Sequence, residues 1–284
     1  YYLGQAYAFT WQNNKVDLLF NGNHESSNID FDHYLKRLGY NFKNQNNELG
    51  GYAILNNKKT SLIMDVGSSP DKKFSSNYQA GALSFEIISN GKKLICNSGY
   101  FQDHNHQLNE LSKSSAIHSV LTLDDRSSCR FLKTKNESSR ISHGLKIIKK
   151  NIVFEKNYWK INVAHDGYLK QYGIIHEREI EFYPEQVKFV GYDKIISKNN
   201  TKNLKFEIRF HLEPNIKIMK TQDNKSILID LDSEGWKFNS NNNIDIDNGL
   251  YFGKKNSFVD NQNIIISGMT NDENQTIKWE ITKI

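Results

Sequence analysis

The stretch ALSFEIISNGKKLICN, residues 82–97, decides the fold class of this chain. Apolar residues run on both sides of Asn90-Gly91, and an Asn-Gly pair between two such runs is a strong short-range signal of a β-hairpin. A second hairpin is predicted upstream, where GYAIL and TSLIMDVG flank NNKK within residues 51–67. The pattern therefore predicts that the main domain begins with paired antiparallel strands.

Further strand-like runs follow as far as the end of the chain. They recur about every ten residues with turn residues between them, which favours a large antiparallel β-sandwich over alternating strands and helices. The main runs after the two hairpins are HSVLTLDD at 118–125, then 145–155, 158–165, 172–183, 186–193, 206–214, 263–268 and 277–282.

The clearest helix signal lies before the hairpins, at residues 28–40, where apolar residues at helical spacing follow capping residues. We therefore predict an all-β fold, a large antiparallel β-sandwich, with one short helix in an N-terminal lead-in segment. The predicted division places the lead-in at residues 1–48 and the sandwich at residues 49–284.

Composition narrows the class of protein. The 284 residues are 37% hydrophobic, which is enough for a sizeable core, and no apolar run reaches the ~18 residues of a membrane-spanning helix. The net charge of +5 comes mostly from scattered lysines; it is compatible with an acidic polymer ligand, and no nucleic-acid-binding motif is present. The opening YYLGQAYAF has none of the features of a signal peptide and is typical of a piece of a longer protein.

The cysteine and histidine spacings do not predict a zinc finger. Cys96 lies in an apolar strand and Cys129 lies far from it in sequence, so free thiols are favoured, with one disulfide as the alternative. The pair His104-x-His106 has a spacing that can chelate a metal, although a solvated loop is the preferred interpretation. These histidines belong to residues 101–115, the longest irregular stretch, and long loops on rigid scaffolds are often functional.

Polar side chains gather around the second hairpin. Asn77 and Gln79 precede its first strand, Asn97 ends its second strand, and His118 begins the next run. Neighbouring strands of one sheet can bring such ends together, so we predict that Asn77, Gln79, Asn97 and His118 form one spatial cluster. Amide oxygens are weak zinc ligands, and the cluster is better suited to hydrogen bonds with a ligand or with loop backbone.

Four cationic side chains within strand-like runs are weaker candidates for contact with an anion. They are His176, Arg178, Arg209 and His211. Arg178 and its neighbour Glu177 point to opposite faces of their strand. A cation inside an apolar strand needs an anion or solvent, so internal ion pairs are the alternative interpretation.

Taken in order, AGALSFEII, GKKLICNSG, SSAIHSVLTLDD, HDGY, YGIIHERE, IRFHLEP, GWKF, LYFG and IIISG resemble the C-terminal domain of the heparinase II/III-like family. The resemblance covers nearly the whole chain from about residue 14 onward. It implies a β-sandwich that follows an N-terminal α/α toroid. It also implies a polysaccharide lyase that acts on acidic, uronate-containing polysaccharide in the bacterial periplasm or envelope.

In this family the sandwich contributes a His-x-His-x-Asp motif just before the Leu-Ser-Phe-Glu strand. Its first histidine is catalytic and falls on Asn77, its second histidine binds a structural metal and falls on Gln79, and its aspartate falls on Gly81. A strand-end aspartate of the metal site falls on Asn97, and the last histidine is kept as His118. The resemblance thus suggests a zinc or calcium site whose ligands are mostly replaced, and we predict no bound metal.

The resemblance implies a lyase that eliminates across the C4–C5 bond of a uronate, with Asn77 in the place of the catalytic histidine and Tyr78 at the substrate. Tyr78 and Tyr100 are alternative tyrosines near the site, but a phenol with a pKa of ~10 is a poor base without a cationic neighbour. This fragment alone is expected to be inactive, because the family's tyrosine acid/base lies in the toroid. The alternatives are a non-catalytic carbohydrate-binding module and a purely structural sandwich.

Overall fold

The structure, a computed structural model, describes residues 11–12, 15–16, 37, 39, 47–57, 59–133, 139–198, 203–253 and 257–284. The helix predicted at residues 28–40 lies outside the described residues, apart from Arg37 and Gly39. In the lead-in, β1 (Trp11–Gln12) pairs with β2 (Lys15–Val16). The predicted division at residue 48 stays a prediction.

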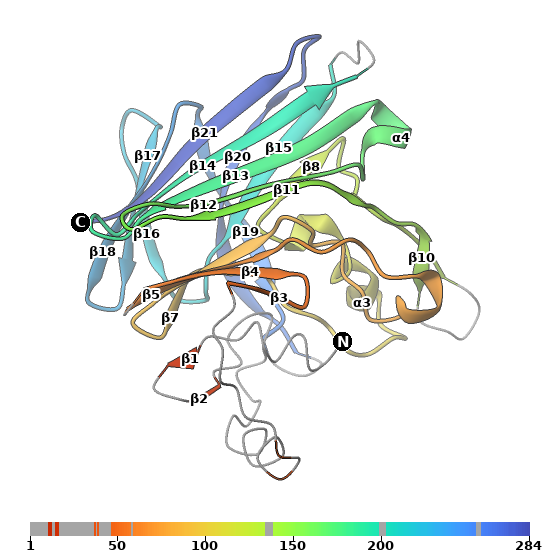
Figure 1. Cartoon of the computed structure of the whole chain (residues 1–284), viewed down its shortest axis with the longest axis horizontal. Coiled ribbons are helices and arrows are strands. Elements are labelled where there is room, and N and C mark those ends of the chain that lie inside the picture. Colours follow the sequence, from red (N-terminus) through yellow and green to blue (C-terminus); the bar gives the residue numbers. More distant parts are fainter. Residues whose placement is uncertain are drawn as a thin grey trace.

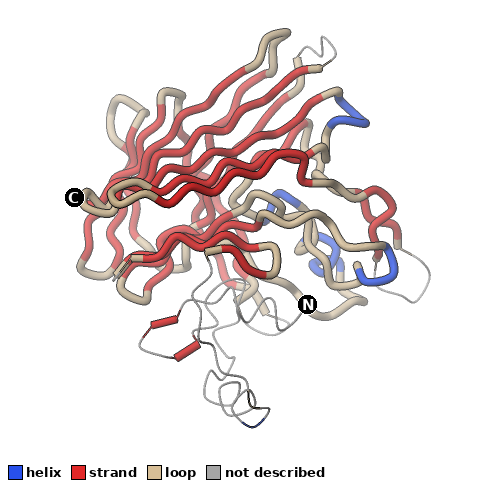
Figure 2. The backbone as a smooth tube through the Cα atoms, in the orientation of Figure 1, coloured by secondary structure: helices blue, strands red, loops and turns tan. Residues whose placement is uncertain are grey.

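One layer is an antiparallel sheet of eight strands in the order β11-β12-β13-β14-β21-β18-β17-β16 (Figures 1 and 2). Its strands are β11 (Ile147–Phe154), β12 (Trp159–His165), β13 (Ile174–Tyr183), β14 (Lys188–Ser197), β16 (Lys217–Lys220), β17 (Ser226–Leu231), β18 (Glu234–Ser240) and β21 (Gln275–Lys283). The C-terminal strand β21 lies between β14 and β18, so it joins the two halves of this sheet.

The facing layer consists of a five-stranded sheet, β3-β4-β5-β6-β7, and a four-stranded sheet, β19-β20-β15-β8. Their strands are β3 (Glu48–Leu49), β4 (Tyr52–Asn56), β5 (Thr60–Asp65), β6 (Phe85–Ser89), β7 (Lys92–Ile95), β8 (Leu121–Leu123), β15 (Lys205–His211), β19 (Ile244–Tyr251) and β20 (Val259–Met269). A bridge in which the Cys96 N–H donates to the His211 carbonyl links β7 to β15. Figure 1 shows the eight-stranded sheet above the five-stranded one.

The core between the layers is built around Trp279 of β21. Its ring stacks on Phe85 at 5.2 Å between centroids and meets Phe210 edge-on at 5.1 Å, so one indole ties all three sheets together. Gly191 on the adjacent strand makes room for it, because a Cβ there would lie 2.0 Å from the indole. Alternation in IKWEIT accounts for this placement, since Ile277 and Ile281 are buried beside the indole.

The predicted all-β sandwich and both predicted hairpins are confirmed. Asn90 and Gly91 have φ values of 46° and 78°, the left-handed pair that a tight hairpin turn requires. The strand predicted at 118–125 is shorter, because only Leu121–Leu123 pairs with β15. Both cysteines are free and buried, as favoured from the sequence.

Several short elements were not predicted, among them α3 (Gln107–Leu111), α4 (Leu169–Tyr172), β9 (Arg130–Leu132) and β10 (Arg140–His143). A single helical turn shows no 3.6-residue periodicity, which explains why α3 and α4 escape a sequence pattern. His106 caps helix α3 through its Nδ1, which accepts the Leu108 N–H, and both His104 and His106 are exposed. In the described part of the chain, no helix reaches the length and hydrophobicity needed to cross a membrane.

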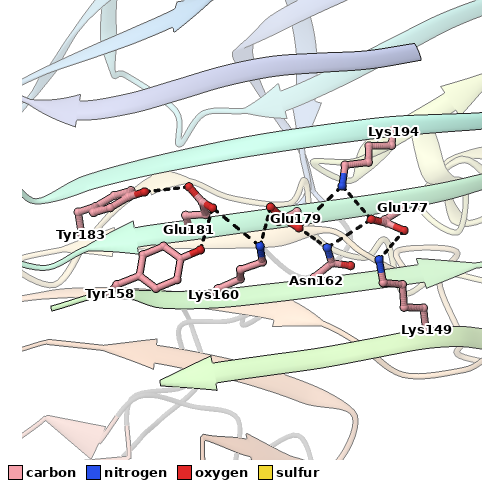
Figure 3. A network of polar contacts seen from close by, with 9 residues as sticks. All are labelled: Lys149, Tyr158, Lys160, Asn162, Glu177, Glu179, Glu181, Tyr183 and Lys194. Carbon is pink, nitrogen blue, oxygen red and sulfur yellow. Dashed lines mark hydrogen bonds and ion pairs between the residues drawn. The ribbon is translucent and has the colours of Figure 1, made fainter. Parts of the chain in front are cut away.

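The outer face of the eight-stranded sheet carries a ladder of ion pairs, shown in Figure 3. Glu177 contacts Lys149 at 2.9 Å and Lys194 at 3.0 Å, and Glu179 contacts Lys160 at 2.9 Å. Partial burial would raise the pKa of Glu177, but the hydrogen bonds from its two lysines outweigh that effect and lower the pKa. Each carboxylate is thus matched by lysines, so this face is charged but locally neutral.

Candidate functional site

The structure places Gln79 beside His118. Nδ1 of His118 lies 2.8 Å from the Ser114 carbonyl oxygen, and Nε2 lies 3.1 Å from the side-chain amide of Gln79. Burial lowers the pKa of His118 to about 4, although the bond to Ser114 acts to raise it. The ring is therefore neutral at pH 7, and its single N–H is donated either from Nδ1 to the Ser114 carbonyl or from Nε2 to Oε1 of Gln79.

Gly81 provides the space that the imidazole occupies. A Cβ at this position would lie 2.5 Å from Cδ2 of His118 and 2.9 Å from Nε2. Real side chains do not approach so closely, so a residue other than glycine here would displace the ring. The His118 ring thus fills the volume that a side chain at position 81 would need.

Asn97 holds the same cluster through the backbone. Its N–H donates to Oε1 of Glu86 at 2.9 Å, and its side-chain Oδ1 accepts the N–H of Ser119 at 2.9 Å. Its Nδ2 donates to Ser84 at 3.3 Å. Asn97 therefore fixes the residue that follows His118, which places three of the four predicted residues in one hydrogen-bonded region.

Asn77 and Tyr78 directly precede Gln79 in the sequence and differ in burial. Asn77 is exposed in a turn two residues before Gln79, so its amide faces solvent. Tyr78 points inward with its side chain 7% exposed, and its ring lies 6.4 Å from that of Phe131. Asn77 is thus exposed, whereas most of the Tyr78 side chain packs inside the protein.

The side chains around His118 do not fit a metal ion. Nε2 of His118 and the Gln79 amide occupy each other, and Oδ1 of Asn97 is taken by the Ser119 N–H. Nowhere in the described ranges do three His, Cys, Asp or Glu side chains gather with metal-site geometry. We therefore derive no chemistry through a metal, and the absence of bound zinc or calcium stays a prediction.

We expect Gly81→Ala to destabilise the fold by about 1–3 kcal/mol, because the new methyl overpacks against His118. A double-mutant cycle with His118→Ala tests the cause. In the His118→Ala background the alanine at position 81 should cost much less, and urea unfolding monitored by tryptophan fluorescence measures all four proteins. Equal costs in both backgrounds would assign the strain to some other neighbour.

His176 and Arg178 lie in the core and not at a surface. Both side chains are fully buried, and Asp193 on β14 accepts from His176 at 2.7 Å and from Arg178 at 2.8 and 2.9 Å. Trp279 adds an indole N–H to the same carboxylate at 2.9 Å. Burial acts to raise the pKa of Asp193, but Arg178 and His176 outweigh it and hold that pKa well below its usual range. His176 and Arg178 therefore form the internal ion pairs that the sequence analysis gave as the alternative to contact with an external anion.

Arg178 also supports the candidate site from the opposite layer. Its Nη1 donates to the Leu83 carbonyl at 2.9 Å and to the Ser119 carbonyl at 2.6 Å. Leu83 follows Gly81 by two residues with φ at 66°, a left-handed conformation that costs a leucine about 1–3 kcal/mol. Ser119 follows His118, so one guanidinium holds the backbone on both sides of the cluster.

Arg209 and His211 also pair internally. Arg209 contacts Glu207 at 2.6 Å and Asp247 at 3.3 Å, with its side chain 20% exposed. His211 is buried between the Ser98 hydroxyl at 3.0 Å and the Ala116 carbonyl at 3.1 Å. The side chains of Arg209 and His211 are therefore engaged with internal partners and are not positioned to bind an anionic ligand in this conformation.

Sequence reasoning missed the residues that hold the cluster. Ser114 and Ser119 supply a carbonyl and an N–H that fix His118 and Asn97, and Glu86 holds the Asn97 backbone. Serine and backbone groups give no sequence signal of this kind. The one available cue was Glu86, a carboxylate that falls on the buried face of a predicted strand.

Comparison with known proteins places this sandwich. Residues 45–280 match the family described as heparinase II/III-like, C-terminal. No curated protein matches the chain. Crystal structures of heparan sulfate lyase HepC from Pedobacter heparinus match with a TM-score of 0.74 at 13% identity, over 97% of this chain and 45% of that one. A mutant of the same enzyme gives a TM-score of 0.73 at 12% identity over the same shares.

A structure described as heparinase III matches with a TM-score of 0.68 at 15% identity, over 99% of this chain and 46% of that one. At such identities these structures show a shared fold, and the chain spans less than half of their length. The match over residues 45–280 covers most of the 284 residues and shows the family. The chain belongs to the heparinase II/III-like family and contains its C-terminal domain, the β-sandwich described above.

Proposed function

We propose that this chain is the sandwich domain of a polysaccharide lyase that cleaves an acidic, uronate-containing polysaccharide by β-elimination. Family membership supports the lineage. The observation that carries the proposal is the hydrogen-bonded region of Gln79, His118 and Asn97, which lies at the positions that the family resemblance assigns to its site. Asn77 lies exposed at the edge of this cluster.

In β-elimination a base removes the proton at C5 of the uronate, the C4–O bond breaks, and a C4–C5 double bond forms. The electron pair of the broken bond leaves with the oxygen, which takes up a proton. Asn77 donates an N–H to the uronate carboxylate and stabilises the negative charge that develops there. An amide cannot accept the C5 proton at neutral pH, so the base belongs to the N-terminal toroid of the parent protein.

In this proposal, hydrogen bonds hold the site together without a metal. Gln79 and Asn97 bond to His118 and to its neighbour Ser119, which are the contacts that a structural ion would otherwise organise. The proposed partners are an acidic polysaccharide and the N-terminal toroid, and the proposed location is the bacterial periplasm or envelope. Neither nucleic acid nor a resident cofactor has a part in it.

We expect the full-length parent to raise the ultraviolet absorbance of a uronate polymer through the new C4–C5 double bond, with or without a chelator. Asn77→Ala should lower the rate about a hundredfold, the typical cost of losing one charge-stabilising donor. Asn151→Ala, a matched change of an exposed asparagine on β11, should leave the rate unchanged. A rate that the chelator abolishes would contradict the metal-free site.

The second candidate function is a non-catalytic carbohydrate-binding or structural module. The observation that favours it is the amide at positions 77 and 79, because neither side chain transfers a proton. A panel of uronate polymers separates the two functions. Binding without any rise in absorbance supports the module, and a rise that depends on Asn77 supports the lyase.

A further inference from the structure

A pocket of about 670 Å³ is lined in part by Ser114, a neighbour of His118. Its wall is formed by Glu110 at the end of α3, by Ser114, and by the segment that carries Arg126, Arg130 and Phe131. Strand β10 and helix α4 complete it. The volume is in the range of sites for ligands the size of a disaccharide. Since the carbonyl of Ser114 binds His118, this pocket and the His118 cluster share one residue.

Two buried polar atoms in this wall lack a partner. Oγ of Ser114 and Oε1 of Glu110 are shielded from solvent, and neither makes a hydrogen bond within the described part of the chain. A buried polar group without a partner costs about 1–3 kcal/mol. Both atoms accept hydrogen bonds, and the Ser114 hydroxyl also donates one, so hydroxyl groups of a ligand would satisfy them once a small shift of the pocket wall uncovers them.

The cations of the same pocket are not matched by carboxylates. Among the described residues, the side chain of Arg126 makes no ion pair, and that of Arg130 binds only the neutral amide of Gln171. Asp125 also lines the pocket but pairs with Lys205 at 3.7 Å. Guanidinium groups bind carboxylate and sulfate in a bidentate manner, so the arginine side of the pocket suits an oxyanion.

Together these groups define the chemistry of a ligand: hydroxyls for Glu110 and Ser114, an acidic group for the two arginines, and an apolar ring face for Phe131. We propose that this pocket is a binding subsite for an acidic saccharide, separate from the Asn77 surface. The ligand class rests on the proposed function, whereas the site and its residues do not. A uronate carboxylate and a sulfate ester share the chemistry that the arginines recognise.

The test is calorimetric titration of this chain at low salt, with no turnover. The probes are a tetrasaccharide of alternating glucuronate and N-acetylglucosamine, neutral chitotetraose, and sodium sulfate. We expect the acidic tetrasaccharide to bind at least tenfold more tightly than chitotetraose. Measurable binding of sulfate alone would assign the anion to a sulfate ester, and its absence to a carboxylate.

Variants locate the binding site. Arg126→Gln and Arg130→Gln should each weaken the tetrasaccharide about tenfold, the effect of one lost charge-assisted bond. Lys217→Gln, a matched loss of an exposed cation on β16, should change affinity less than twofold. Ser114→Ala should weaken binding without lowering the melting temperature, because the hydroxyl has no partner to lose. A purely structural role for Ser114 would lower the melting temperature instead.

Three results would overturn the proposal: no heat at millimolar tetrasaccharide, equal weakening by all three cation variants, or no effect of either arginine variant. The first result would show that the acidic saccharide is not a ligand. The other two would show that Arg126 and Arg130 do not form its binding site. Each is distinguishable from failure of the proposed function, which is read from absorbance of the full-length parent. An inactive parent whose sandwich still binds through Arg126 and Arg130 would keep the subsite and reject only the lyase.

Discussion

Asp193→Asn is expected to destabilise the sandwich by about 3–5 kcal/mol, the cost of removing one member of a buried ion pair. The carboxylate is fully buried and accepts hydrogen bonds from His176, Arg178 and Trp279. Asparagine keeps one acceptor but turns an N–H group toward donors. Arg178 then remains buried with its charge uncompensated, which the low-dielectric core penalises.

The loss should be seen as a fall of about 10 °C in melting temperature, because about 1 kcal/mol shifts a domain of this size by about 2–4 °C. Glu280→Gln is the matched control, since it breaks the partly exposed pair with Lys188 at 3.0 Å. That change should cost about 0–1 kcal/mol. Circular dichroism on heating measures both. A fall for Asp193→Asn no larger than for Glu280→Gln would show that the core does not depend on this charge.

The same variant connects stability to the site. Arg178 holds the carbonyls of Leu83 and Ser119, and these residues flank Gly81 and His118. Release of the guanidinium removes the support for the left-handed backbone at Leu83. The pairing of Gln79 with His118 should therefore loosen along with the core, even though Asp193 lies on the other layer of the sandwich.

Local pattern was enough to predict the architecture. The hairpin over 82–97 and the alternation in IKWEIT determine which side chains face inward, and both depend only on neighbours in sequence. The placement of Arg178 depends on register between strands, because its partner Asp193 lies directly across from it on β14. Register cannot be read from one strand, so the sequence left open whether this arginine faces a ligand or an internal carboxylate.

The site was predictable only in part, because its contacts join segments that are distant in the sequence. Family resemblance singled out Gln79, Asn97 and His118. The expectation that one sheet brings them together was wrong, because Asn97 follows β7 of the five-stranded sheet whereas His118 precedes β8 of the four-stranded sheet. What the sequence could not show is how they are used. The Gln79 amide contacts Nε2 of His118, and the imidazole ring fills the space beside Gly81. Both contacts depend on packing between two segments, because Gly81 and His118 are 37 residues apart in the sequence.

Acid is expected to destabilise this protein below about pH 6.5 through histidines that are buried in neutral form. Desolvation lowers the pKa of His118 to about 4 and that of His211 to about 3, from 6.5 when unfolded. The unfolded chain thus takes up protons on these rings at a pH where the folded chain cannot. Stability is full above pH 6.5 and falls with pH until each folded pKa is reached.

The size of the effect follows from these values. At pH 5 each ring lies about 1.5 pH units below its unfolded pKa, which corresponds to about 2 kcal/mol, or about 4 kcal/mol for the two. Desolvation lowers the pKa of His165 and His176 as well, so both act in the same direction. In His176 the neighbouring Asp193 opposes the shift without reversing it.

Asp65 acts with the opposite sign. Burial raises its pKa to about 7 despite a bond from the Gly67 N–H, so the folded chain binds a proton that the unfolded chain releases. Its contribution is present at low pH and is lost as the pH rises from about 4 to about 7, which offsets part of the histidine effect. Asp65→Asn should therefore make the acid destabilisation steeper, whereas replacing a histidine should make it shallower.

Urea unfolding at intervals from pH 8 to pH 5 tests both signs. His211→Gln lowers stability at every pH by removing the bonds to Ser98 and Ala116, so the informative quantity is the slope. That slope should fall by about 1.4 kcal/mol per pH unit near pH 5.5, the effect of one proton. An unaltered slope in His211→Gln would mean that this ring is protonated inside the folded protein, and that its bonds to Ser98 and Ala116 tolerate a charge.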